Sequence, residues 1–184
     1  KAGALWSGGA AQRHSPLHTP VVASIAHDVP QQRIMVLRAV DWDSRTLRFH
    51  TDRRSTKCGE FDAHASVSVL GYHPEEKVQM RLSGTATLLT EGAVFEESWS
   101  RSTLFARRCY LAQAAPGLAT DAPTSGLPAE VEGQLPTARD ISPAKENFAV
   151  LMVQFDALDG LYLANAGHRR AQFRFDDDAG WHGN

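Results

Sequence analysis

Hydroxyl and cationic side chains gather in the segment TDRRSTK, residues 51–57. Thr51 ends one predicted strand, and Ser55, Thr56 and Lys57 lie where a short helix is predicted to begin. The N–H groups and the dipole at a helix N-terminus favour negative charge, and cationic side chains strengthen that preference. The segment therefore predicts a binding site for a phosphate dianion.

Two arginines lie on the strand predicted before this segment, in RIMVLR at residues 33–38. Side chains five residues apart on a regular strand project from opposite faces, so both arginines cannot bind one phosphate unless the strand bulges. We assign Arg33 to the phosphate and expect Arg38 to point toward the rest of the ligand or a substrate. Gln79 follows on a later strand, five residues before Gly84, which suits a bend or bulge. Each residue alone is common on protein surfaces, whereas the ordered set indicates a nucleotide site.

The elements that must position these residues are predicted to be mostly strands. Residues 28–32 read as the turn of a hairpin between the first two strands. On the third strand Leu47, Phe49 and Thr51 face one way and the residues between them face the other. Runs of β-branched and apolar residues predict strands at 21–27, 33–41, 46–51, 64–72, 77–89, 148–156, 160–165 and 168–176.

Three helical segments interrupt this pattern. A short helix is expected at 4–13, another begins after Ser55, whose side-chain oxygen can cap its N-terminus, and a longer one spans 91–112. Residues 114–146 contain five prolines and read as a long irregular loop. The number and short spacing of the strands predict a mainly β fold, a small antiparallel barrel with inserted helices. The length suits one domain spanning residues 1–184.

Composition argues against several other functions. The formal net charge is −2, so nothing suggests binding to nucleic acid, and no apolar run approaches the ~20 residues that span a membrane. Cys58 and Cys109 are far apart, which supports neither a disulfide framework nor a cysteine zinc site. His14 and His18 are four residues apart, but Pro16 between them argues against a helical metal site. We therefore expect no metal and a cytoplasmic location.

The succession RIMVLR, FHTDRRSTK, QMRLSGTA and HRR is similar to the pyridoxamine 5′-phosphate oxidase-like FMN-binding split barrels. The resemblance covers about residues 20–181, with its motifs concentrated in the central half. It implies an antiparallel split β-barrel that forms a homodimer, with FMN at the dimer interface and a small molecule as substrate. FMN would carry the redox chemistry, so no side-chain nucleophile is required.

The resemblance also implies a role for each matching residue. Residues 33–38 would line the flavin, with their central backbone groups near the ring, and Gln79 would hydrogen-bond the pyrimidine edge. The phosphate and ribityl end would lie among residues 50–57, and Arg170 would approach the ring from the other subunit. The cofactor-binding residues expected are Arg33, Ile34, Met35, Val36, Leu37, Arg38, His50, Thr51, Ser55, Thr56, Lys57, Gln79 and Arg170.

The C-terminal part of the resemblance leaves alternatives open. The HRR match can slip by one to four residues, so Arg169 and Arg174 compete with Arg170 for the place beside the flavin. The tryptophan that the family carries near the flavin in its late strands is replaced here by one of residues 161–163.

The helix expected at 91–112 departs from the substrate motif of the family. Pyridoxamine phosphate oxidases carry Tyr, Arg and Ser there at four-residue spacing, whereas this chain has Trp99, Thr103 and Arg107. Losing an arginine that binds phosphate through two hydrogen bonds is not a conservative change, so we expect a substrate other than phosphorylated pyridoxine. The substrate contacts expected are Arg38, Trp99, Arg107, His168 and Arg169.

These features together predict an FMN-binding protein that acts as a flavin-dependent oxidoreductase of an unidentified small molecule. Two alternatives remain open at this point. One is a non-catalytic flavin-binding carrier or sensor, and the other is a split barrel that uses a different cofactor, such as a deazaflavin or haem.

Overall fold

The computed structural model describes residues 1–134 and 136–183, which form two compact units. Unit 1 contains residues 1–49, residues 60–87 and the chain from Met152 onward, and unit 2 contains residues 50–59 and 88–151. A single folding domain over the whole chain stays a prediction.

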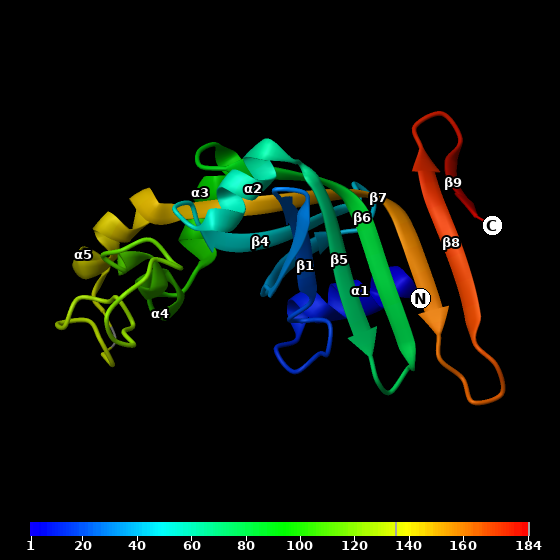
Figure 1. Ribbon diagram of the computed structural model, residues 1–184, viewed down its shortest axis with the longest axis horizontal. Helices are drawn as coiled ribbons and strands as arrows, with labels where there is room; N and C mark the ends of the chain where they lie inside the picture. Colours follow the sequence, from blue (N-terminus) through cyan, green and yellow to red (C-terminus); the bar gives the residue numbers. More distant parts are fainter. Residues whose placement is uncertain (135, 184) are drawn as a thin grey trace. The chain divides into compact units, whose positions relative to one another are not determined.

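Most of the described strands belong to unit 1 and form a mainly antiparallel sheet (Figure 1). Along the sheet the order is β2-β1-β5-β6-β7-β4-β3, and β8 pairs with both β7 and β9. No pairing among the described residues joins β2 to β3, so the strands do not close into a complete barrel. The strands are β1 (Val21–Ala26), β2 (Val29–Ile34), β3 (Leu37–Asp41), β4 (Thr46–Asp52), β5 (Ser66–His73), β6 (Val78–Leu89), β7 (Phe148–Tyr162), β8 (Arg169–Asp176) and β9 (Gly180–Gly183).

The first hairpin turns earlier than predicted. His27 and Asp28 have φ values of 50° and 61°, and Ala26 pairs with Val29, so β1 and β2 are joined by a two-residue turn. Residues 29–32, predicted to be the turn, are strand. Pro30 is tolerated there because β2 ends the sheet, where an N–H without a ladder partner costs little.

The strand predicted at 33–41 is in fact two strands. β2 ends at Ile34 and β3 begins at Leu37, with Met35 and Val36 between them outside any strand. The N–H groups of Met35 and Leu37 donate to main-chain oxygens of the segment before β1, which draws the chain out of the β1 ladder. Arg33 and Arg38 therefore lie on different strands. Alternation along a single strand does not decide which way their side chains project.

Gly84 is required by close packing and not by a bulge. The pairing of β5 with β6 runs without a shift from Ser66 opposite Thr85 to His73 opposite Val78. A Cβ at Gly84 would lie 2.0 Å from the main-chain oxygen of Gln154 on β7. The prediction of a bend was wrong because a backbone neighbour, and not the strand's own geometry, calls for glycine here.

The two strands predicted at 148–156 and 160–165 are one long strand, β7. Asp159 and Gly160, which resemble a turn in sequence, lie in regular register opposite Gln172 and Ala171 of β8. The acidic turn after β8 forms as expected, because an Asp176 carboxylate oxygen accepts from the N–H groups of two following residues.

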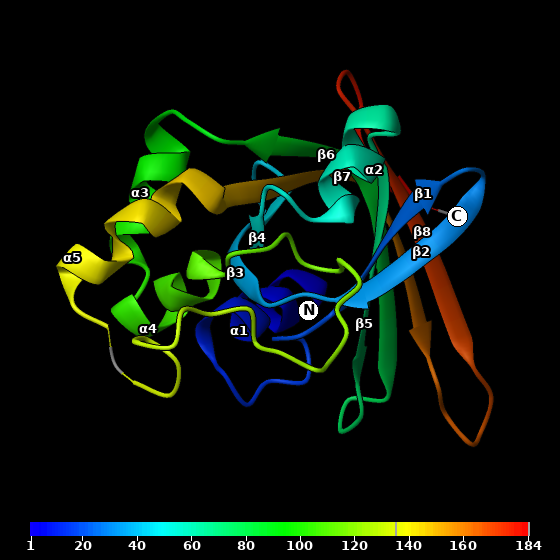
Figure 2. The ribbon, with the colours of Figure 1, turned by 60° about the vertical axis from the view of Figure 1, so that its left-hand side comes forward.

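Unit 2 contains most of the described helices (Figure 2). The helix predicted at 91–112 is broken, because Thr103 has extended backbone and its hydroxyl caps the next helix by accepting from the N–H of Ala106. The loop predicted at 114–146 is irregular over much of its described length but ends in two short helices. The helices of the chain are α1 (Ala2–Ala11), α2 (Thr56–Ala63), α3 (Ala93–Arg101), α4 (Leu104–Arg107) and α5 (Ala138–Ile141), with 3₁₀ turns at Arg108–Leu111 and Ser142–Asn147.

Each unit has a core of its own. In unit 1 the inward faces of the strands bury apolar side chains such as Leu47, Phe49 and Phe155, which confirms the alternation predicted for β4. In unit 2 the ring of Phe148 is surrounded by four aromatic rings at centroid distances of 5.0–5.3 Å. Burial of this apolar area stabilises each unit.

Candidate functional site

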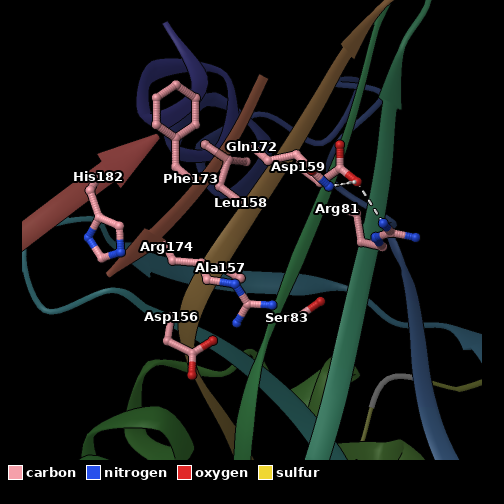
Figure 3. A pocket seen from close by; sticks show the side chains of 10 residues that line it. All are labelled: Arg81, Ser83, Asp156, Ala157, Leu158, Asp159, Gln172, Phe173, Arg174 and His182. Atoms are coloured by element: carbon pink, nitrogen blue, oxygen red, sulfur yellow. Dashed lines mark hydrogen bonds and ion pairs between the residues drawn. The ribbon is translucent and has the colours of Figure 1, made fainter. Parts of the chain in front are cut away.

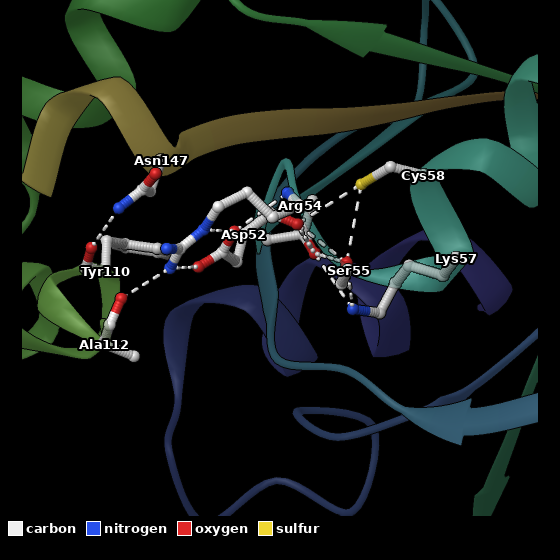
Figure 4. A network of polar contacts seen from close by, with 9 residues as sticks. Asp52, Arg54, Ser55, Lys57, Cys58, Tyr110, Ala112 and Asn147 are labelled. Atoms are coloured by element: carbon white, nitrogen blue, oxygen red, sulfur yellow. Dashed lines mark hydrogen bonds and ion pairs between the residues drawn. The ribbon is translucent and has the colours of Figure 1, made fainter. Parts of the chain in front are cut away.

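The end of β4 and the start of α2 bring three predicted site residues together in unit 2. Lys57 Nζ donates to Thr51 Oγ1 at 3.1 Å and to Ser55 Oγ at 2.8 Å (Figure 4). The two hydroxyl oxygens are 3.4 Å apart, and both residues are only 5% exposed. We call Thr51, Ser55 and Lys57 the cradle.

The cradle is supported by an ion pair within its own loop. Arg54 donates through Nε and Nη2 to the two carboxylate oxygens of Asp52 at 3.0 and 2.7 Å, and its main-chain N–H donates to the same carboxylate at 2.9 Å. The hydrogen bond to Asp52 raises the pKa of the Arg54 guanidinium above its usual value. Arg54 Nη2 also donates to the oxygen of Ala112 at 2.8 Å, which ties the loop to the later part of unit 2.

The backbone turns into α2 directly behind the cradle. The N–H of Cys58 donates to the main-chain oxygen of Ser55, which begins the helix, and the thiol of Cys58 donates to the oxygen of Asp52. The predicted helix is confirmed, and the Ser55 hydroxyl donates to Asp52 O at 2.7 Å. Two hydroxyls, an ammonium and the positive end of a helix dipole thus meet in one place, a combination that favours an anion.

Arg33, predicted to bind phosphate, is engaged in an ion pair in unit 1. Its Nη2 lies 2.6 Å from Glu60 Oε2, and its Nη1 donates to Ser24 Oγ at 2.6 Å. The Arg33 and Glu60 side chains are 20% and 12% exposed. Arg33 is therefore paired with a carboxylate in this structure, and its contact with a phosphate stays a prediction.

The backbone predicted to face a flavin ring is partly committed to the fold. The N–H of Met35 donates to Pro20 O at 3.1 Å and that of Leu37 to His18 O at 2.8 Å. The Met35 and Leu37 side chains are buried, while Ile34 is 69% exposed. These two N–H groups are therefore already used within the fold. Val36 is half-buried and Arg38 is exposed.

Gln79 and Arg170 also lie in unit 1. Gln79 is half-buried on β6, two residues before Arg81. Arg170 Nη2 and Arg81 Nη2 both lie 2.6 Å from Asp159 Oδ2, so one carboxylate serves two guanidinium groups. The hydrogen bond from Arg170, with the charge of Arg81, holds the pKa of Asp159 below its usual value. Which arginine of β8 meets a ligand stays a prediction.

A cavity of about 320 Å³ lies beside this ion pair in unit 1 (Figure 3). Arg81 and Asp159 are joined at its edge, and Arg174 and His182 come from β8 and β9. Its lining combines cationic, anionic and hydroxyl groups, so it is polar without a dominant charge. Of the arginines predicted to compete for the flavin, Arg174 is the one that lines this cavity.

The residues predicted to contact substrate are divided between the two units. Trp99 is 9% exposed and packs on Phe148 and Tyr110, and the Arg107 guanidinium carbon lies 4.8 Å from the centre of a Trp99 ring. His50 packs edge-on against Phe148 in the same cluster. These three residues belong to unit 2, whereas His168 and Arg169 are exposed in unit 1, at and just before the start of β8. Thr56, the remaining predicted site residue of α2, is exposed.

Neither a membrane-spanning helix nor a metal-binding cluster is found among residues 1–134 and 136–183. No helix in that part of the chain is long and apolar enough to cross a membrane. No group of three or more His, Cys, Asp or Glu side chains lies close enough to hold a metal ion, again among the residues described.

Two acidic residues of these clusters were missed by sequence reasoning. Glu60 follows Lys57 by three residues on α2, so its place on the same side of the helix was a usable signal. The ion pairs of Asp159 could not be predicted, because Asp-Gly resembles a turn and the partners Arg81 and Arg170 are distant in sequence.

Comparison with known proteins gives the family context. Residues 6–90 match the family model described as pyridoxamine 5′-phosphate oxidase, FMN-binding domain, over a little under half of the chain. Both the cradle and the β2–β3 segment lie inside this match. A search of the curated proteins finds no match.

Solved structures share the fold over a larger part of the chain. A pyridoxamine 5′-phosphate oxidase-related, FMN-binding protein from Nostoc punctiforme is 21% identical, with a TM-score of 0.76 over 100% of this chain and 94% of that one. PhzG from Burkholderia lata, in complex with tetrahydrophenazine-1-carboxylic acid, is 18% identical, with a TM-score of 0.70 over 98% and 86%. At such identities these likenesses show the fold alone. Residues 6–90 are thus similar to the FMN-binding domain of the pyridoxamine 5′-phosphate oxidase family, in a chain that shares the fold of the solved structures above without matching one specific enzyme.

Proposed function

We propose that the protein binds FMN, with the phosphate held at the cradle, and acts as a flavin-dependent oxidoreductase of a small molecule. The observation that carries the proposal is the cradle itself, in which Lys57 Nζ is fixed by Thr51 and Ser55 at the start of α2. Its position within the matched FMN-binding domain supports the same reading.

The residues present fit the phosphate end of FMN. A phosphate dianion needs several donors around it, and the cradle offers the Lys57 ammonium and N–H groups of the first turn of α2, while the Ser55 hydroxyl already donates to Asp52 O. Thr51 and Ser55 are almost fully buried, so water competes little for these donors. Arg33 adds less than expected because Glu60 already neutralises it.

Carbonyl groups around Met35–Leu37 and the amide of Gln79 suit the N–H and carbonyl edge of a flavin. FMN, when bound, supplies the hydride and electron transfer. The protein's own residues bind its phosphate, orient its ring and keep water away.

We also propose that the protein works as a homodimer in the cytoplasm, with Arg170 of each subunit directed at the flavin of the other. Asp159 holds the Arg170 guanidinium through Nε and Nη2, at 2.9 and 2.6 Å, and so fixes its orientation. Both described cysteines are unpaired, which suits a reducing compartment.

A visible spectrum of the purified protein tests the binding proposal first. We expect flavin absorption bands, and release of FMN on denaturation identified by mass spectrometry. A colourless protein that takes up no added FMN in a titration refutes it. A copurifying deazaflavin or haem would show that this barrel serves another cofactor. Sedimentation of the FMN-loaded protein tests the dimer, because a monomer that still binds FMN tightly contradicts a shared site.

A flavin-binding protein without turnover is a second candidate, favoured by one observation. Two of the residues that replace the family's substrate motif have structural contacts here: Trp99 packs in the core of unit 2, and Thr103 caps α4. Stopped-flow reduction by nicotinamide nucleotides separates the two functions. Reduction at a useful rate supports the oxidoreductase, and its absence with every donor tried supports a carrier or sensor.

A further inference from the structure

Arg45, in the turn between β3 and β4, supplies a guanidinium with few polar partners in the described part of unit 1. Its side chain is 14% exposed, and its Nε is buried without a hydrogen-bond partner among the described residues. Within that part of the chain its ion pair is with Asp177, at 3.9 Å from Nη2 to Oδ1, and the Asp177 side chain is 96% exposed. Such an ion pair contributes little, because water surrounds the carboxylate. Since buried donors in proteins are normally satisfied, the Arg45 donors call for water or a ligand.

The Phe175 ring holds this guanidinium in one orientation. The Arg45 guanidinium carbon lies 3.3 Å from the centre of the ring. Such a contact occupies a face of the guanidinium, whereas its N–H groups lie in its plane and stay available to hydrogen-bond acceptors. The Phe155 N–H donates to the main-chain oxygen of Arg45 at 2.9 Å, which fixes the turn that carries the side chain. The Arg45 donors are therefore held in place before a ligand binds.

Arg45 lines a cavity of about 290 Å³, and all the residues that line it belong to unit 1. Thr85 of β6 and Gln154 of β7, both exposed polar residues, also line it. Small-molecule sites in proteins have volumes of about 300–1,000 Å³, so this cavity is at the lower end of that range. Its size suits a ligand as large as an amino acid and is too small for a nucleotide.

Two carboxylates, from Asp156 and Asp177, line the same cavity. No hydrogen bond or ion pair joins the Asp156 carboxylate to another described residue, and in Figure 3 it lies apart from the joined pair of Arg81 and Asp159. Two carboxylates near Arg45 disfavour a simple anion and attract a cation. A ligand that carries both charges satisfies the arginine and the carboxylates together.

We propose that this cavity binds a free amino acid or a related small zwitterion. The ligand carboxylate accepts two parallel hydrogen bonds from the Arg45 guanidinium, a geometry that this group favours. The ligand ammonium lies against Asp156, and the exposed Asp177 adds negative charge. The inference goes beyond the proposed function, because it neither requires bound flavin nor involves the cradle.

Calorimetric titration of the purified protein with each of the common amino acids tests the proposal. We expect at least one of them to bind, one per chain, with a dissociation constant below about 1 mM. The corresponding acid without the amine, and the corresponding amine without the carboxylate, should each bind at least about tenfold more weakly, because each lacks one charged contact. Absence of binding by every amino acid at about 10 mM overturns the proposal, and equal affinity for the acid alone overturns the assignment of a zwitterion.

Two variants of the cavity assign the contacts. Arg45→Gln and Asp156→Asn should each weaken binding of that amino acid at least about tenfold. Arg101→Gln is the matched control, because this arginine belongs to unit 2, where it pairs with Glu97, and should leave the affinity unchanged. Unchanged affinity in either cavity variant, or an equal loss in the control, overturns the proposal.

Arg45→Lys covers the case in which Arg45→Gln does not fold. Lysine keeps the positive charge but cannot donate two parallel hydrogen bonds to one carboxylate, so we expect weaker binding of the amino acid here as well. Unchanged affinity in this variant overturns the carboxylate contact at Arg45.

Discussion

Replacing Lys57 by alanine removes the one ammonium of the cradle. Its Nζ donates to Thr51 and Ser55 at 3.1 and 2.8 Å, so it lies where a phosphate oxygen shared with these hydroxyls would be bound. A hydrogen bond to a charged group is worth about 1.5–3 kcal/mol, which corresponds to about a 10- to 140-fold rise in the FMN dissociation constant.

Fluorescence titration with FMN and with riboflavin measures this effect. We expect the loss for FMN and at most about a twofold change for riboflavin, because only FMN carries the phosphate. Lys145→Ala is the matched control, because this lysine also lies in unit 2 but pairs with Glu96. A variant that binds FMN normally, or that loses both flavins equally while its melting temperature falls, would refute the phosphate assignment.

Two further predictions concern stability. Gly84→Ala should lower the free energy of unfolding by about 1–3 kcal/mol, because its Cβ would lie 2.0 Å from Gln154 O, while Gly59→Ala, with open space around it, should be neutral or slightly stabilising in denaturant titrations. The lowered pKa of Asp159 means that its ion pairs stabilise the folded state fully above about pH 4 and that this contribution is lost as the pH falls through the lowered value. Asp159→Asn should therefore be less stable than the parent at neutral pH but lose less stability on acidification, and an unchanged acid-unfolding slope would contradict this.

The parts of the fold that follow from local signals were predicted well from sequence. The alternation of β4 and the short helix after Ser55 depend on neighbouring residues, and both are confirmed. The cradle follows from them, because Thr51 and Lys57 are close in sequence and only the turn between strand and helix is needed to bring them together.

The errors come from contacts between distant segments. The break between β2 and β3 depends on main-chain oxygens of His18 and Pro20, which strand propensity does not include. The Asp-Gly pair at 159–160 stays in β7 because β8 pairs along it, so tertiary pairing overrides a turn signal. The ion pair of Arg33 with Glu60, 27 residues later, was not predicted, because nothing local in the sequence marks the two side chains as partners.

A crystal structure of the FMN complex tests the central claim most directly. We expect the phosphate within hydrogen-bonding distance of Lys57 Nζ and of N–H groups in the first turn of α2. A phosphate bound elsewhere, with Lys57 still held by the two hydroxyls as it is without ligand, would contradict the account.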